Sequence, residues 1–260
     1  MARQKWWGRG PGARHLLAVL AVLAVAGCSP TAEGGTGPGA TDPKPSAGES
    51  TGSDTGDTGG TGGTGGAGGG GGEDAGTLPG VPSAAEARKL LDGLKVAPQG
   101  SMSGYSREKF PHWSEQGDNC DTREVVLERD GQDVKRNDEC RAVSGTWNSV
   151  YDDETFTDSS DLDIDHMVPL ANAWRSGADD WTQDRREEFA NDLTHPQLIA
   201  VSASSNRSKG DQGPDEWQPP AKTYWCVYGR AWTSVKSTYE LTVTEAEKSE
   251  LDEMLGTCAS

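Results

Sequence analysis

The stretch that decides the fold reads Asp161-Leu-Asp-Ile-Asp-His-Met-Val-Pro-Leu170. Its first half alternates apolar residues with Asp, which predicts a half-buried strand. Its proline suits the first turn of a helix, so a short helix is expected over 169–175. Side chains that are adjacent on a strand point to opposite faces of it. The chain must therefore twist or leave the strand where Asp165 meets His166.

The residues that follow complete a strand, two helices, a second strand and a third helix. A charged helix is expected over 182–191, with Phe189 on its inner face. The apolar run Leu198-Ile-Ala-Val201 predicts a short buried strand. Ser202 suits an N-cap and Gly210 a helix end, so a short helix is expected between them.

Helices are also expected on both sides of this centre. Ser83-Ala-Ala-Glu86 and Thr244-Glu-Ala-Glu247 match the capping-box pattern, and leucines at helical spacing follow each of them. The aromatic stretch 224–239 predicts a further helix. Segment 104–113 is expected to be irregular, with aromatic core anchors that include Trp113. The sequence thus predicts an α+β domain that is mainly helical.

A family resemblance rests on several motifs in a fixed order over about residues 104–258. The motifs are Arg107…Phe110…Trp113, Cys120-Asp-Thr-Arg-Glu-Val-Val-Leu127, Ile164-Asp-His-Met-Val-Pro-Leu-Ala171, Ala173-Trp-Arg-Ser-Gly-Ala178, Phe189-Ala-Asn-Asp192 and Asn206-Arg-Ser-Lys-Gly-Asp211. Together they resemble the HNH nucleases, and most closely the branch related to the C-terminal domain of modification-dependent, GmrSD-type restriction enzymes, in particular its secreted actinobacterial members. The resemblance implies a ββα-metal (His-Me finger, HNH) core.

The resemblance also implies roles for three residues. His166 is the expected general base, because an imidazole titrates near neutral pH. Asp165 and Asn206 are the expected ligands of one divalent metal ion. Their oxygen atoms suit Mg²⁺ or Mn²⁺, and a mixed set with His also accepts Zn²⁺ or Ni²⁺. The expected reaction is hydrolysis of phosphodiester bonds in nucleic acid, with DNA as the expected substrate and the choice between DNA and RNA left open.

The family has a further residue that orients the general base. Two residues stand as candidates for this role. Gln197 directly precedes the second predicted strand, and Asn191 lies in the Phe-Ala-Asn-Asp segment.

Other polar residues have a functional and a structural interpretation. Arg123 fits a buried ion pair or a phosphate contact. Arg207 and Lys209 directly follow Asn206 on the expected helix and are expected to meet the substrate phosphate, although a solvated helix face would also explain them. His195, in a loop beside a proline, is interpreted as incidental, and His112 as structural.

The N-terminal third predicts export. Four basic residues precede the apolar run Leu16–Val25, which is too short to span a bilayer and is typical of a signal peptide. Small residues then lead to Cys28, as in a bacterial lipobox. We therefore expect a lipoprotein signal peptide over 1–27, a disordered Gly/Thr/Ser-rich tether over 28–81 and an HNH nuclease domain over 82–260. The lipid anchor on the extracellular face would be the only membrane contact, and a monomer is expected.

The chain has five cysteines. If Cys28 carries lipid, an even number remains in an oxidising compartment. Four cysteines allow three pairings. We favour Cys120–Cys140 and Cys226–Cys258, because each pair brackets a compact segment. Metal binding by these cysteines is disfavoured, because no CxxC spacing is present.

The formal net charge of -17 argues against a protein that simply coats nucleic acid, since such proteins usually carry a basic face. It does not exclude a nuclease, because a metal ion and a few basic residues can hold the reacting phosphate. Two rival functions remain. A non-catalytic surface module would retain the fold but would not need the polar groups of Asp165, His166 and Asn206. A hydrolase of another bond would need further His ligands or an HExxH helix, and neither is present.

Overall fold

The protein is seen in a computed structural model, which describes residues 78–259. The expected signal peptide, the lipidation site Cys28 and nearly all of the expected tether lie outside these residues. Within them, no helix has the length and apolar character needed to cross a membrane. Leu78, which is only 5% exposed, already packs into the core ahead of residue 82, where the sequence placed the start of the domain.

The centre of the fold is an antiparallel pair of strands. Strand β6 (Leu162–His166) pairs with β7 (Leu198–Ser202), and His166 lies opposite Leu198. Helix α5 (Ala203–Lys209) follows β7 directly, capped by the Ser202 hydroxyl as its sequence predicts. Between the two strands the chain forms α3 (Leu170–Arg175) and α4 (Gln183–Ala190). The predicted strands and helices of this region are confirmed.

The two faces of β6 contact different hydrophobic cores. Leu162 and Ile164 pack with residues of β7 and of helix α2 (Thr122–Asp130). The alternating acidic side chains point toward α5, on the side of a larger, mainly helical core. The period of two in the sequence therefore separates an apolar face from a polar one.

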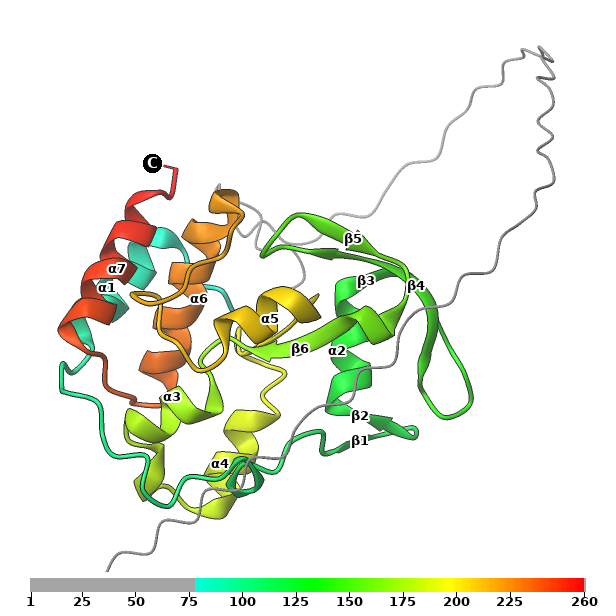
Figure 1. Cartoon of the computed structure of the whole chain (residues 1–260), viewed down its shortest axis with the longest axis horizontal. Coiled ribbons are helices and arrows are strands. Elements are labelled where there is room, and N and C mark those ends of the chain that lie inside the picture. Colours follow the sequence, from blue (N-terminus) through cyan, green and yellow to red (C-terminus); the bar gives the residue numbers. More distant parts are fainter. Residues whose placement is uncertain (1–77, 260) are drawn as a thin grey trace, which may run out of the picture. The chain divides into compact units, whose positions relative to one another are not determined.

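The helical core is built from three helices that pack together. These are α1 (Ala84–Gly93), α6 (Trp225–Thr238) and α7 (Glu245–Gly256), as Figure 1 shows. The predicted capping box forms at Thr244, whose hydroxyl accepts the Glu247 N–H while the Glu247 side chain binds back to the Thr244 N–H. All three predicted helices are confirmed.

The remaining elements lie beside the central strands. Strands β3 (Gly131–Arg136), β4 (Ala142–Ser149) and β5 (Glu154–Phe156) form an antiparallel sheet, and β1 (Glu115–Gly117) pairs with β2 (Cys120–Asp121). Short 3-10 turns are η1 (Arg107–Lys109), η2 (Ser159–Asp161), η3 (Ala178–Asp180) and η4 (Lys222–Tyr224). The described residues thus form a mixed α/β fold.

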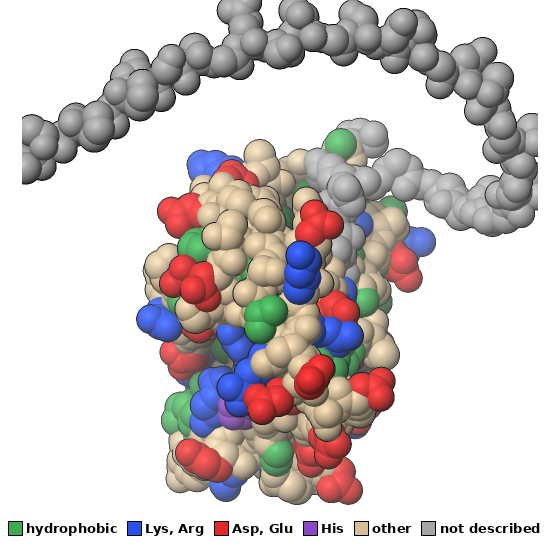
Figure 2. Space-filling view, turned by 90° about the vertical axis from the view of Figure 1, so that its right-hand side faces the viewer, with side chains coloured by type: hydrophobic (Ala, Val, Ile, Leu, Met, Phe, Trp, Pro, Cys, Tyr) green, Lys and Arg blue, Asp and Glu red, His purple; other side chains and the backbone are tan. Residues whose placement is uncertain are grey.

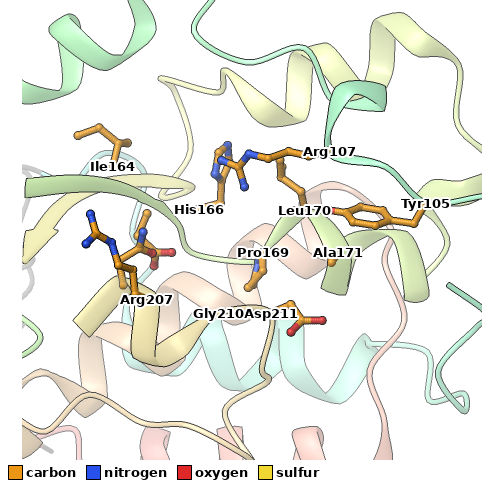
Figure 3. A pocket seen from close by; sticks show the side chains of 12 residues that line it. Tyr105, Arg107, Ile164, His166, Pro169, Leu170, Ala171, Arg207, Gly210 and Asp211 are labelled. Atoms are coloured by element: carbon orange, nitrogen blue, oxygen red, sulfur yellow. The ribbon is translucent and has the colours of Figure 1, made fainter. Parts of the chain in front are cut away.

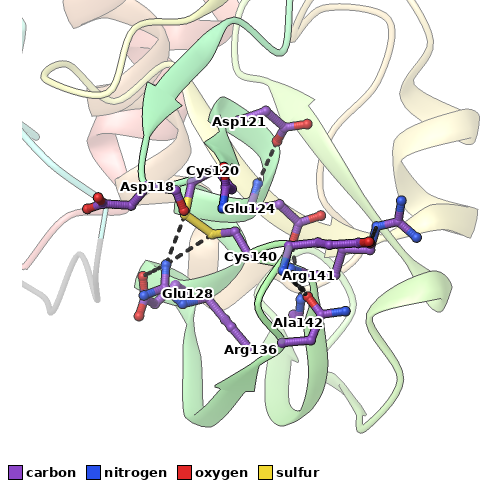
Figure 4. Close-up of a disulfide and its surroundings, with 12 residues drawn as sticks. Asp118, Cys120, Asp121, Glu124, Glu128, Arg136, Cys140, Arg141 and Ala142 are labelled. Carbon is purple, nitrogen blue, oxygen red and sulfur yellow. Dashed lines mark hydrogen bonds and ion pairs between the residues drawn. A yellow bond between two sulfur atoms is a disulfide. The ribbon is translucent and has the colours of Figure 1, made fainter.

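Both predicted disulfides are present, Cys120–Cys140 and Cys226–Cys258. The first ties β2 to the loop between β3 and β4, where Arg136 Nη1 lies 3.2 Å and 3.1 Å from the two sulfur atoms (Figure 4). The second joins the first turn of α6 to Cys258, two residues past the end of α7. The first bond therefore links β2 to the three-stranded sheet, and the second links two helices of the helical core.

Removing the bond between Cys226 and Cys258 is expected to destabilise the helical core. The bond closes a sequence separation of 32 residues, and cross-links of this span typically stabilise a fold by about 2–4 kcal/mol. The Cys226→Ala/Cys258→Ala variant should lose about this much free energy of unfolding in guanidinium titrations, with reduced wild type as a control. An unchanged midpoint would contradict a stabilising role for this bond.

Candidate functional site

A pocket of about 250 Å³ lies where β6 ends. Three segments line it (Figure 3). Asp165 and His166 come from β6, Asn206 and Arg207 from α5, and Arg107 from η1. Because β6 ends at His166, the two adjacent side chains reach one pocket although they leave the strand on opposite sides. The structure thus brings the predicted base and both predicted metal ligands together.

The His166 ring is held by a backbone carbonyl. Its Nε2 lies 3.0 Å from the Ala190 oxygen, and a carbonyl only accepts, so Nε2 carries the hydrogen. Ala190 is the last residue of α4, where carbonyls lack partners within the helix. Burial lowers the pKa of His166 to about 3, so the ring is neutral at pH 7. Nδ1 is therefore left with a free lone pair.

The Asp165 carboxylate is buried in a tight hydrogen-bond cluster. Lys209 Nζ donates to both of its oxygens at 2.9 Å and 2.7 Å, and the Tyr151 hydroxyl donates to Oδ2 at 2.6 Å. Lys209 also donates to the His166 carbonyl at 2.8 Å. A carboxylate offers about four lone-pair directions. Three are used here, so one remains on Oδ1.

The position of Lys209 corrects its expected contact with substrate. Its side chain is fully buried behind Asp165, and burial lowers its pKa while the Asp165 charge opposes that shift. The ammonium group therefore balances a carboxylate inside the protein and is not available to a phosphate. Arg207, in contrast, is exposed at the pocket, with its Nε 3.5 Å from an oxygen of Asp163.

Asn206 is oriented by a neighbouring acidic residue. Its Nδ2 donates to Asp163 Oδ2 at 3.1 Å, and its Oδ1 has no hydrogen-bond partner among residues 78–259. With Asp165 Oδ1 this gives two oxygen donors at one pocket. Mg²⁺ binds through one or two protein oxygens and retains several waters, so the donor set fits such an ion. No group of three or more His, Cys, Asp or Glu residues in this part of the chain could hold a metal, so Zn²⁺, which takes at least three protein ligands, fits less well.

Asn191 anchors the segment that precedes β1. Its Oδ1 accepts from the Ser114 N–H at 2.9 Å and the Thr122 hydroxyl at 2.8 Å. Its Nδ2 donates at 2.8 Å to the carbonyls of Pro111 and Glu187. These contacts fix residues 111–114 against the end of α4. They do not reach the His166 ring.

Gln197 acts on the other side of His166. Its fully buried side chain accepts from the Val168 N–H at 3.1 Å and donates to the Val168 carbonyl at 3.0 Å. The Met167 N–H also donates to the Gln197 carbonyl at 2.7 Å. This extends the β6–β7 pairing past His166. Both candidates for the orienting residue therefore hold backbone near the base, one on each side of it.

Trp113 is a site residue that the sequence did not reveal. Its ring stacks on His166 with centroids 5.8 Å apart and planes at 29°. Its φ is +65°, an outlier for so bulky a residue, and such strain persists where surrounding contacts impose it. The sequence only predicts an aromatic anchor here, since neither the left-handed backbone nor the contact with His166 has a local signal.

Arg123 and His195 lie away from the pocket. Arg123 donates to the carbonyls of Ser159 and Leu162 at 3.1 Å and 3.0 Å, so it ties α2 to the start of β6. His195 Nδ1 lies 2.7 Å from Asp192 Oδ2 in a separate pocket of about 390 Å³. Neither residue is brought to the His166 pocket.

Replacing Lys209 is expected to lower the stability of the fold. Removing one partner of a buried ion pair leaves an uncompensated charge and typically costs about 3–5 kcal/mol. Lys209→Met should lower the free energy of unfolding by about this amount in chemical denaturation, and adding Asp165→Asn should restore part of it. Arg207→Ala, at an exposed position of the same helix, should change it by less than about 0.5 kcal/mol. Equal stability of Lys209→Met and wild type would show that the pair contributes little.

Comparisons with known proteins identify the family. A family model described as "GmrSD restriction endonucleases, C-terminal domain" matches residues 121–254, which include Asp165, His166 and Asn206. The chain is 57% identical over 182 residues to an "Uncharacterized secreted protein" of Arthroderma benhamiae, and the alignment covers 70% of this chain and 89% of that protein. No solved structure matches the chain. The chain therefore belongs to the family of GmrSD restriction endonuclease C-terminal domains.

Proposed function

We propose that this chain is an exported endonuclease that hydrolyses phosphodiester bonds of nucleic acid, DNA first of all, with one divalent metal ion. The observation that carries the proposal is the shared pocket of His166, Asp165 and Asn206. A neutral imidazole, a carboxylate oxygen and an oriented amide oxygen are the groups that water activation and charge stabilisation require. The family match supports the reaction class.

His166 is the general base. Its Nε2–H is engaged by Ala190, so Nδ1 accepts a proton from a water molecule in the pocket. The water oxygen forms a bond to phosphorus, the bond to the leaving sugar oxygen breaks, and that oxygen takes a proton from solvent. A phosphate in the pocket raises the pKa of the buried ring, because a nearby negative charge favours the imidazolium.

Asp165 Oδ1 and Asn206 Oδ1 are the groups that would hold the metal ion. A divalent cation supplies positive charge where negative charge develops on the phosphate and the leaving oxygen. The Asp163 carboxylate accepts a hydrogen bond from Asn206 Nδ2, so the amide is turned with its Oδ1 away from Asp163. Lys209 and Tyr151 keep the Asp165 carboxylate in one orientation.

The order of β6, β7 and α5 fits the ββα-metal unit of HNH nucleases. Within it, Trp113 covers the His166 ring, Asn191 holds the segment that carries Trp113, and Gln197 holds the backbone after His166. We therefore assign both Asn191 and Gln197 as positioning residues that act through the backbone.

The proposed site of action is outside the cytoplasm. The basic, apolar and small-residue order before Cys28 supports export followed by lipid anchoring, and both disulfides suit an oxidising compartment. The name of the Arthroderma benhamiae relative describes it as secreted, which supports export.

The His166→Ala variant should lose plasmid cutting in the presence of Mg²⁺ or Mn²⁺. Loss of a general base typically lowers the rate by about 10²- to 10⁴-fold. His195→Ala is the matched control, since His195 lies in the separate pocket, and it should cut at the wild-type rate. Asn206→Ala should need a higher metal concentration for half-maximal cutting, and EDTA should stop all cutting. A wild type that is inert with every divalent metal, or a His166→Ala variant that cuts equally well, would refute the proposal and favour a non-catalytic surface module.

The Asn191→Ala variant should lower kcat with little change in KM. Without its four hydrogen bonds the 111–114 segment and Trp113 are free to move off His166, and small displacements of a catalytic group cost about 10²-fold. Single-turnover cutting measures this step. Asn148→Ala, at an exposed position of β4, is the control and should behave like wild type. A wild-type kcat for Asn191→Ala would show that this anchoring is not needed.

A further inference from the structure

The charges that line the pocket are balanced with one exception. Asp165 is paired with Lys209 at 2.7 Å and Arg207 with Asp163 at 3.5 Å. Asp211 is paired at 2.5 Å with Arg175. The fourth charged side chain of the lining, Arg107, has no ion-pair partner among the residues that the structure describes. The pocket therefore has an excess of one positive charge, at the side opposite α5.

Arg107 is held in place by His112. Its Nε lies 3.4 Å from His112 Nε2, a long hydrogen bond, while His112 Nδ1 lies 2.9 Å from the Phe110 carbonyl. Since a carbonyl only accepts, Nδ1 carries the His112 hydrogen and Nε2 accepts from Arg107. Both Nη groups of Arg107 are thus left without partners in the described part of the chain.

Arg107 also lies close to the proposed base. Figure 3 shows its side chain extending from η1 toward His166. Its charge is one of the causes that lower the pKa of His166. The His112 ring lies 6.4 Å from the His166 ring and 5.2 Å from the Trp113 ring. The guanidinium is therefore part of the same wall as the ring that covers the base.

We propose that Arg107 binds the non-bridging oxygens of the scissile phosphate through its two Nη groups, and that His112 is the positioning residue that holds it. This inference rests on the proposed nuclease function. A guanidinium with two free, parallel N–H donors matches a phosphate in bidentate geometry. The phosphate supplies the negative charge that the pocket lacks. Arg107 lies before residue 121, so the family match does not cover it.

The face of the protein in Figure 2 carries charges of both signs. In Figure 2, Lys and Arg side chains gather around the histidine visible on that face, and acidic side chains are spread over the rest of it. With a net charge of -17, long-range attraction does not bring nucleic acid to the protein. Phosphate binding has to come from cations inside the pocket itself.

The test measures binding and cutting separately on the full chain. Binding of a short fluorescein-labelled DNA duplex is followed by anisotropy in the uncut His166→Ala background over a range of salt concentrations. Adding Arg107→Ala should weaken binding and reduce the slope of log K against log salt by about 0.9, the value for one lost phosphate contact on duplex DNA. Inorganic phosphate should also inhibit cutting less in Arg107→Ala than in wild type.

Cutting is measured with His166 intact. Arg107→Ala should lower kcat/KM by roughly 10- to 100-fold, as expected for a lost charge-assisted hydrogen bond. Arg107→Lys should keep the salt slope but not kcat, because the charge remains and the bidentate geometry is lost. Arg141→Ala is the control, since its side chain is 72% exposed and pairs with Glu139 outside the pocket.

The positioning role of His112 is tested by a double-mutant cycle. His112→Ala should lower kcat/KM in the wild type and cause no further loss when Arg107→Ala is already present. Additive losses would show that His112 does not act through Arg107.

The outcomes separate the two proposals. If Arg107→Ala folds like wild type and keeps its affinity, salt slope and kcat/KM, the inference is wrong while the nuclease function stands. If the wild type cuts no nucleic acid, the proposed function fails, and the anisotropy arm still decides whether Arg107 binds phosphate.

Discussion

The buried ion pair between Lys209 and Asp165 is the contact on which the site depends. It joins the last turn of α5 to β6, and both charges are almost completely removed from water. Such a pair is stable only when its remaining donors and acceptors are satisfied. Tyr151 and the His166 carbonyl satisfy them here. The same contact sets the rotation of α5, because Asn206 lies three residues before Lys209 and so shares its face of the helix. With Lys209 fixed behind the strand, Asn206 is directed to the pocket.

The orientation of His166, the proposed base, depends on where α4 ends. Because Ala190 is the last residue of that helix, its carbonyl has no helical partner and is free to accept from His166. The negative end of the helix dipole also lies there, which favours an N–H donor at this point. Because His166 contacts the backbone carbonyl of residue 190, this contact does not require a particular side chain there. The side chain that matters is that of Asn191, which ends the helix and ties it to the segment of Trp113.

Much of the fold could be predicted from local sequence signals. The alternation in 161–166, the apolar run 198–201 and the caps at Ser202 and Thr244 each predicted an element that forms. Cysteine parity and spacing led to both disulfides. These signals succeed because periodicity, capping and chain closure depend on residues that are near one another in sequence.

The parts that could not be predicted are contacts between distant segments. Lys209 and Arg207 are two residues apart on one helix, and only the packed structure shows that the first is buried and the second exposed. The left-handed backbone of Trp113 is imposed by its surroundings and has no glycine or asparagine to signal it. Arg107 stood among the family motifs, but its missing counter-charge can be seen only when all the charges of the pocket are placed.

The balance of charge in the pocket bears on how an acidic protein would hold the polyanion that the proposed function requires. Three acidic side chains at or beside the pocket are each paired with a cation, so their charges do not repel a phosphate strongly at close range. Long-range repulsion from the acidic surface is screened beyond about 8 Å at physiological salt, whereas contacts inside a partly buried pocket are screened much less. Under the proposed nuclease function, affinity would be concentrated at the single phosphate that enters the pocket. Such a site would bind nucleic acid where it reacts and make few contacts with the rest of the nucleic acid strand, which suits cutting better than coating.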